Sequence, residues 1–147
     1  MGDVKRKFAT ILATDCVGFS KHMREDEQAT FESLNACREI IDSLIEQHGG
    51  RIFHTAGDSV LADFESPIET VNCAIKFQEA IQERNETISD EDPRRKLLWR
   101  IGIHSDDVIF EKDNVYGNGV NIAARLEAQC VPGQILVSRA INEQVAS

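Results

Sequence analysis

The stretch Phe53–Phe64, FHTAGDSVLADF, predicts a β-hairpin and is the strongest local indication of the fold. Apolar and polar side chains alternate along Ser59–Phe64, which is the period of a strand with one buried face. Gly57 and Asp58 interrupt this alternation and belong to the residue types that favour tight turns. A turn of this kind needs no function. The stretch alone therefore leaves open whether Asp58 is only a turn residue or is held at the hairpin tip for chemistry.

The remainder of the chain contains further helical and strand-like periods. An apolar stripe at helical spacing predicts one long helix between the turn at Gly18 and the glycines at 49–50. The other expected elements are strands at 8–14, 51–55, 59–64, 97–104 and 134–137, helices at 67–81, 120–129 and from 139, a loop at 84–96, and a turn with a second short strand within 106–116. This order predicts an α+β fold, a ferredoxin-like sandwich with a mainly antiparallel sheet and flanking helices. We expect the first strand to lie beside the strand that follows the first helix.

Length and composition limit the classes of protein. The 147 residues predict a single domain, 1–147, and the net charge of −9 argues against a nucleic-acid-binding surface. No apolar run approaches the length of a membrane span, and the basic residues before position 8 do not lead into a signal peptide. The cysteines at 16, 37, 73 and 130 form no CxxC pair. Their scatter favours buried free thiols in a cytoplasmic protein over disulfides or zinc.

Two aspartates beside glycines are candidate metal ligands. Asp15 follows the strand expected at 8–14, and Asp58 lies at the hairpin tip. If the first strand lies in the sheet centre, both carboxylates reach the same sheet edge. Two oxygen ligands with open coordination positions suit Mg²⁺ or Mn²⁺, which also bind the phosphate oxygens of a substrate. Because Asp is common in turns, the pair is a stronger indication than either residue alone.

The helix expected at 120–129 has a polar face. Asn121 and Arg125 are four residues apart and therefore share that face. An amide and a guanidinium placed in this way can hold a substrate oxygen and a phosphate. The alternatives are a solvated face, or an ion pair between Arg125 and Glu127 or another carboxylate.

Four segments between about Phe8 and Val145 follow one another in a recognisable order: FATILATDCVGFS, GGRIFHTAGDSVLADFESP, WRIGIHSDDV and NVYGNGVNIAARLEAQCVPGQILVS. They resemble the successive motifs of the class III nucleotidyl cyclase catalytic domain, the adenylate and guanylate cyclases. Four motifs in register are highly specific. The resemblance implies a head-to-tail homodimer whose active sites lie at the interface and take residues from both chains.

The resemblance also implies ligands for the metal and the phosphates. Asp15 and Asp58 match the two metal-binding aspartates, and the backbone carbonyl of Cys16 joins them in holding two Mg²⁺ or Mn²⁺ ions per site. The turn that matches the phosphate-holding segment consists of Val17, Gly18, Phe19 and Ser20. On the other subunit, Asn121 matches the residue that orients the ribose, and Arg125 matches the arginine that stabilises the transition state.

The implied reaction is attack of the ribose 3′-hydroxyl on the α-phosphate of ATP, with release of pyrophosphate and formation of 3′,5′-cyclic AMP. The positions that select the base depart from the family pattern. His54 stands where adenylyl members carry Lys, and Asn114 stands where they commonly carry Asp. The Glu and Cys that are common in guanylyl members are not present there either. Both side chains can hydrogen-bond a purine edge, so we expect ATP as the substrate, with GTP as the alternative.

Two other departures argue against full activity. Asp106 replaces a glycine that is usual in the family, and family domains continue past position 147 with a strand pair that carries a triphosphate-binding lysine. We therefore expect this chain, which lacks that strand pair, to turn over weakly or not at all. A longer parent protein would add a regulatory domain.

The competing function is a truncated cyclase-like module that binds nucleotide or only dimerises. A diguanylate cyclase is disfavoured, because the polar helix is present and the hairpin has no GGDEF-like stretch.

Overall fold

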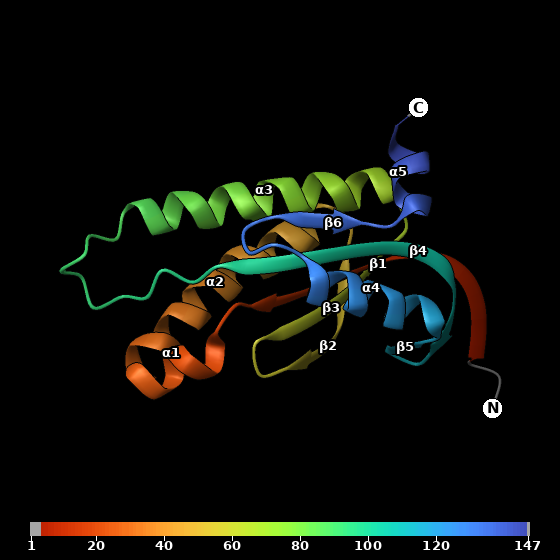
Figure 1. The fold of residues 1–147 in the computed structure, drawn as a ribbon. Helices are drawn as coiled ribbons and strands as arrows, with labels where there is room; N and C mark the ends of the chain where they lie inside the picture. Colours follow the sequence, from red (N-terminus) through yellow and green to blue (C-terminus); the bar gives the residue numbers. More distant parts are fainter. Residues whose placement is uncertain (1–3, 147) are drawn as a thin grey trace.

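The computed structural model describes residues 4–146, which form an α+β fold with a six-stranded sheet and five helices (Figure 1). In chain order the elements are β1 (Val4–Cys16), α1 (Phe19–Glu25), α2 (Glu27–Gln47), β2 (Arg51–Ala56), β3 (Ser59–Phe64), α3 (Pro67–Glu86), β4 (Trp99–Glu111), β5 (Asn114–Tyr116), α4 (Asn118–Gln129), β6 (Ile135–Val137) and α5 (Arg139–Val145). The predicted α+β fold with a mainly antiparallel sheet is confirmed, since among the strands of residues 4–146 only β6 runs parallel to its neighbour.

The strand order is β2-β3-β1-β4-β5, with β6 paired to β4. The expectation that β1 lies beside the strand after the first helix is wrong, because that strand, β2, is at the sheet edge. The hairpin returns through β3, and β3 is the strand that pairs with β1, with Thr14 opposite Val60. Asp58 immediately precedes β3, so the turn that carries it still arrives at the end of β1.

The long helix expected after the Gly18 turn is two helices, α1 and α2. The helical conformation is interrupted at Asp26, whose backbone is extended with φ −159°. The Asp26 side chain accepts a hydrogen bond from the backbone N–H of Ala29 at 3.0 Å and caps α2. The strand expected at 97–104 begins at Trp99 and continues to Glu111. It therefore pairs with β1 along the whole length of β1.

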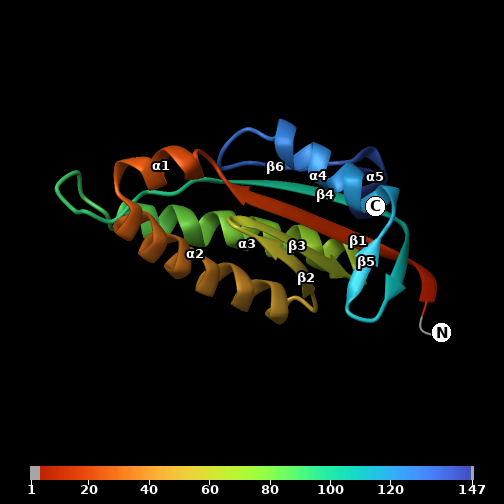
Figure 2. The ribbon, with the colours of Figure 1, turned by 90° about the horizontal axis from the view of Figure 1, so that it is seen from below.

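Helices cover both faces of the sheet (Figure 2). Side chains of α2, α3 and α5 join one core with strand residues such as Leu12 and Phe64, and α4 joins a second, smaller core with residues such as Ile11 and Ala13. Successive strand residues point to opposite faces, so the odd-numbered residues at this end of β1 face α4. Asp15 is one of them.

Helix α4 lies directly against β4 because Gly102 has no side chain. A Cβ at Gly102 would come within 2.4 Å of the Glu127 backbone nitrogen and 2.5 Å of the Ala123 carbonyl oxygen. This close approach fixes the height of α4 above the sheet and brings Glu127 towards the strands.

All four cysteines are buried and free, as the sequence predicts. Within residues 4–146, every helix is too short or too polar to cross a lipid bilayer.

Candidate active site

The hairpin tip contacts the end of β1 through Asp58. Gly57 has φ 59° and makes the tight turn, and the Asp58 carboxylate accepts a hydrogen bond from the backbone N–H of Cys16 at 2.9 Å. Burial raises the pKa of the Asp58 carboxyl, and the negative charge of Asp15 adds to this effect. The amide of Cys16 acts in the opposite direction. The structure therefore brings the two predicted carboxylates to one place, on either side of Cys16.

Asp15 is held by an arginine that the sequence reasoning missed. Arg100 lies opposite Asp15 in the β1–β4 register, and its guanidinium donates from Nε to Oδ1 at 3.0 Å and from Nη2 to Oδ2 at 2.8 Å. This is a bidentate pair of the kind that fixes the plane of a carboxylate. An arginine inside the strand pattern WRIGIH was the available signal, because a charge within a half-buried strand needs a partner.

Glu127 is a second site residue that the sequence reasoning missed. It is only 8% exposed, and its carboxylate lies 3.3 Å from Arg100. The pKa of Glu127 is raised to about 7, chiefly by burial and then by the nearby charge of Asp15, while the charge of Arg100 acts in the opposite direction. The alternative that Arg125 pairs with Glu127 is wrong, since among the ion pairs of residues 4–146 the Glu127 carboxylate is bound by Arg100.

The donor set fits a hard divalent cation. Asp15, Asp58 and the Cys16 backbone offer only oxygen ligands, which suit Mg²⁺ and Mn²⁺. Within residues 4–146 no three His, Cys, Asp or Glu side chains come together as a complete metal cage. Magnesium is commonly held by one or two carboxylates, and substrate phosphates complete its coordination. A site with two protein carboxylates is of that kind.

The turn after β1 is exposed at the same end of the strand. Gly18 has φ 65° and immediately precedes α1, and Val17 is anchored by a backbone hydrogen bond to the carbonyl of Leu98 at 2.7 Å. Phe19 and Ser20 are the first residues of α1. The segment predicted to hold phosphates thus follows directly after Cys16 and the carboxylate pair.

Asn121 and Arg125 lie on the exposed face of α4, while Ala123 and Glu127 face the sheet. Among the residues described here, no hydrogen bond or ion pair joins Asn121 or Arg125 to either aspartate. One chain therefore presents two separate half-sets of the predicted site residues. Their meeting across a dimer stays a prediction.

The two base-selecting candidates lie on β2 and β5. His54 is exposed, next to a bulge in the β2–β3 pairing. The Asn114 amide donates to the Tyr116 hydroxyl at 3.1 Å and accepts from the backbone N–H of Val115 at 2.9 Å. The roles of His54 and Asn114 in base selection stay predictions.

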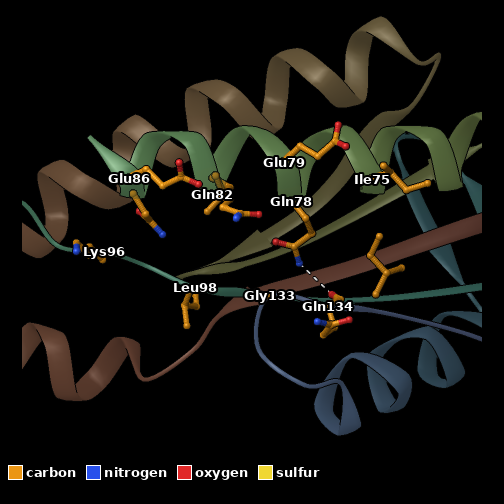
Figure 3. Close-up of a pocket in the computed structure, with 12 residues that line it drawn as sticks. Ile75, Gln78, Glu79, Gln82, Glu86, Lys96, Leu98, Gly133 and Gln134 are labelled. Atoms are coloured by element: carbon orange, nitrogen blue, oxygen red, sulfur yellow. Dashed lines mark hydrogen bonds between the residues drawn. The ribbon is translucent and has the colours of Figure 1, made fainter. Parts of the chain in front are cut away.

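A larger cavity lies elsewhere, between α3 and β6 (Figure 3). It has a volume of about 700 Å³ and contains none of the predicted site residues. Gln78 crosses it and donates to the backbone carbonyl of Gln134 at 2.9 Å. The carboxylates Asp15 and Asp58 lie at the end of β1, outside this cavity.

Comparison with known proteins agrees with the geometry. A family profile described as "Adenylate and Guanylate cyclase catalytic domain" matches residues 4–146. The chain is 37% identical over 143 residues to "Putative adenylate cyclase 3" of Rhizobium meliloti (strain 1021), a match that covers 97% of this chain and 24% of that protein. The chain therefore spans about a quarter of the length of that relative.

Solved structures show the same fold. The adenylate/guanylate cyclase/hydrolase from Silicibacter pomeroyi is 37% identical with a TM-score of 0.85, over 95% of this chain and 80% of that chain. The guanylyl cyclase Cya2 is 26% identical with a TM-score of 0.88, over 100% of this chain and 82% of that chain. One relative is thus named for adenylate and another for guanylate chemistry.

Proposed function

Because this chain belongs to the adenylate and guanylate cyclase catalytic domain family, we propose that it converts ATP to 3′,5′-cyclic AMP and pyrophosphate. The observation that carries the proposal is the convergence of Asp15 and Asp58 on either side of Cys16. In this proposal residues 1–147 form one catalytic domain. The domain acts as a head-to-tail homodimer in the cytoplasm. The free buried thiols fit a reducing compartment.

Asp15, Asp58 and the Cys16 carbonyl would hold two Mg²⁺ or Mn²⁺ ions. The chemistry that such ions would supply is a lower pKa for the ribose 3′-hydroxyl and compensation of the triphosphate charge. Arg100 keeps the Asp15 carboxylate oriented, and the Cys16 amide does the same for Asp58. The Val17–Ser20 turn follows directly after Asp15 and Cys16, and the terminal phosphates would bind there.

Asn121 and Arg125 of a second copy complete the site in this proposal. Asn121 orients the ribose, so that its 3′-oxygen lies in line with the bond from the α-phosphorus to the leaving oxygen. That oxygen loses its proton to solvent water as it forms the new bond to the α-phosphorus, and the bond to the leaving oxygen breaks with its electron pair staying on pyrophosphate. Arg125 meets the negative charge that develops on the α-phosphate. Their exposure on α4 supports this role, because groups that serve another subunit must face outward.

The base is read by His54 and Asn114 in this proposal. We favour ATP because the Rhizobium relative is named an adenylate cyclase, and GTP is the alternative because Cya2 is a guanylyl cyclase. Both side chains have hydrogen-bonding groups of the kinds that pair with a purine edge.

The test is product formation. The protein is incubated with ATP or GTP and Mn²⁺, and the products are separated by chromatography. We expect a low yield of cyclic AMP from the unaltered chain, in line with the weak turnover expected from the sequence, none from Asp58→Ala, and the same low yield from Asp90→Ala, which removes an exposed loop carboxylate. Metal-dependent nucleotide binding without a cyclic product would instead identify a non-catalytic cyclase-like module.

A further inference from the structure

A small cavity borders the Val17–Gly18 turn. Its volume is about 270 Å³. Apart from the turn, its lining includes Lys21, His22, Glu25, Lys96 and Leu98. Lys21 belongs to the first turn of α1, whereas Lys96 belongs to the segment that leads into β4. Two lysines from distant parts of the sequence therefore reach one cavity.

The backbone fixes this arrangement. The Val17 N–H donates to the Leu98 carbonyl at 2.7 Å. This hydrogen bond holds the segment that carries Lys96 next to the turn. The His22 N–H donates to the Gly18 carbonyl at 3.0 Å, which fastens α1 to the same turn. Lys21 follows Cys16 by five residues, and Lys96 precedes Leu98, which is bonded to Val17. The backbones of both lysines therefore lie near Cys16.

The other charged groups of the cavity are already partnered. Arg95 pairs with Glu25 and donates to the ring nitrogen Nδ1 of His22. Burial lowers the pKa of His22, and the charge of Arg95 lowers it further, so the ring is neutral near pH 7. Among the ion pairs of residues 4–146, none involves Lys21 or Lys96. Lys21 and Lys96 therefore both line one cavity without a carboxylate partner within residues 4–146, in a protein whose net charge is −9, and Lys96 also lines the cavity between α3 and β6.

We propose that Lys21 and Lys96 bind the β- and γ-phosphates of the nucleoside triphosphate and hold the pyrophosphate as it leaves. The inference rests on the proposed function, which places the α-phosphate at Asp15 and Asp58. Lysine ammonium groups bind phosphate as compact point charges with three donors each. Their position beside the turn adds positive charge next to the segment proposed to hold the phosphates, and this relieves the repulsion that an acidic protein exerts on a triphosphate.

The test uses inorganic tripolyphosphate with Mn²⁺ as the probe, and AMP with Mn²⁺ as the probe that lacks the terminal phosphates. Binding of both is measured by calorimetry for Lys21→Gln, Lys96→Gln and the double variant. Lys76→Gln is the matched control, because Lys76 is an exposed lysine on α3 that has no ion pair within residues 4–146 and does not line the cavity. Circular dichroism confirms that each variant is folded.

We expect the double variant to weaken tripolyphosphate binding by roughly tenfold to a hundredfold, because the two lysines are exposed and their charge-assisted contacts together contribute about that order when lost. AMP binding and the Lys76→Gln protein should be unchanged, and the salt dependence of tripolyphosphate binding should decrease.

Equal tripolyphosphate affinity in the double variant, the control and the unaltered chain would overturn the inference while leaving the proposed function intact. Mn²⁺ binding that is unaffected by Asp58→Ala would overturn the proposed function itself, and the inference with it.

Discussion

Arg100 holds the Asp15 carboxylate across the β1–β4 pair, with Nε 3.0 Å from Oδ1 and Nη2 2.8 Å from Oδ2. The same guanidinium donates to the backbone carbonyl of Ala128 at 3.0 Å and lies 3.3 Å from the Glu127 carboxylate. One cation therefore joins the end of β1, which carries a proposed metal ligand, to the C-terminal end of α4. Two acids share it, and one of them is buried.

Removal of Arg100 should destabilise the fold more than removal of a comparable arginine. Arg100→Ala leaves Asp15 and the buried Glu127 without their cation, so we expect a loss of about 2–4 kcal/mol in the free energy of unfolding. Arg38→Ala is the control. Arg38 also makes a two-point contact, with Asp42 at 2.9 and 3.2 Å, and has similar side-chain exposure, but it lies on α2. Denaturant unfolding at pH 7 measures both. Equal losses would mean that the Arg100 cluster contributes no more than a surface pair.

Stability of the metal-free protein should decrease as the pH rises from about 4.5 to about 7. Glu127 has a folded pKa of about 7 against an ordinary value of 4.5, so the folded state binds more protons than the unfolded state in this window. The stabilisation is complete below the ordinary pKa and is lost as the pH passes the folded pKa. Glu127→Gln removes this titration.

For Glu127→Gln we expect a flatter pH profile and, at pH 8, a gain of about 1–3 kcal/mol over the unaltered chain. Denaturant unfolding in EDTA at pH 5, 6, 7 and 8 supplies the two profiles. Parallel profiles would contradict the raised pKa.

Divalent metal should stabilise the folded protein through Asp15 and Asp58. A ligand that binds only the folded state stabilises it by about 2.7 kcal/mol at a concentration of 100 times Kd. We therefore expect Mn²⁺ to raise the melting temperature, EDTA to reverse the effect, and Asp15→Asn or Asp58→Asn to abolish it. Asp90→Asn, in an exposed loop, should respond as the unaltered chain does. A Mn²⁺ response that persists in both site variants would place the metal elsewhere.

The parts of the fold that depend on local periodicity could be predicted from the sequence. Alternation along Ser59–Phe64 is enough to specify β3, because a strand with one buried face has a period of two. The meeting of Asp15 and Asp58 was also predicted, although from a wrong strand adjacency. That prediction succeeded because Asp58 lies in the turn itself, so its position does not depend on which hairpin strand pairs with β1.

Features set by long-range register could not be predicted in the same way. The pairing of Asp15 with Arg100 joins residues 85 apart and depends on the alignment of thirteen-residue β1 with β4. The burial of Glu127 depends on how closely α4 approaches Gly102. The break between α1 and α2 did carry a local signal, since Asp26 is a good N-cap residue. The apolar stripe that dominates the later part of the helix concealed it.

The proposed division of the site between two subunits predicts complementation. Asp58→Ala and Arg125→Ala should each be inactive, and Arg125→Ala should fold normally because its side chain is exposed. In a mixed head-to-tail dimer, one site takes the intact Asp58 from one chain and the intact Arg125 from the other. Random pairing in an equal mixture gives half mixed dimers with one working site each, so activity should recover to about a quarter of the unaltered value. An equal mixture of Asp58→Ala and Asp15→Ala should stay inactive, because every site then lacks a carboxylate. Failure of the first mixture, with dimers verified by sedimentation, would mean that each chain builds its site from its own residues.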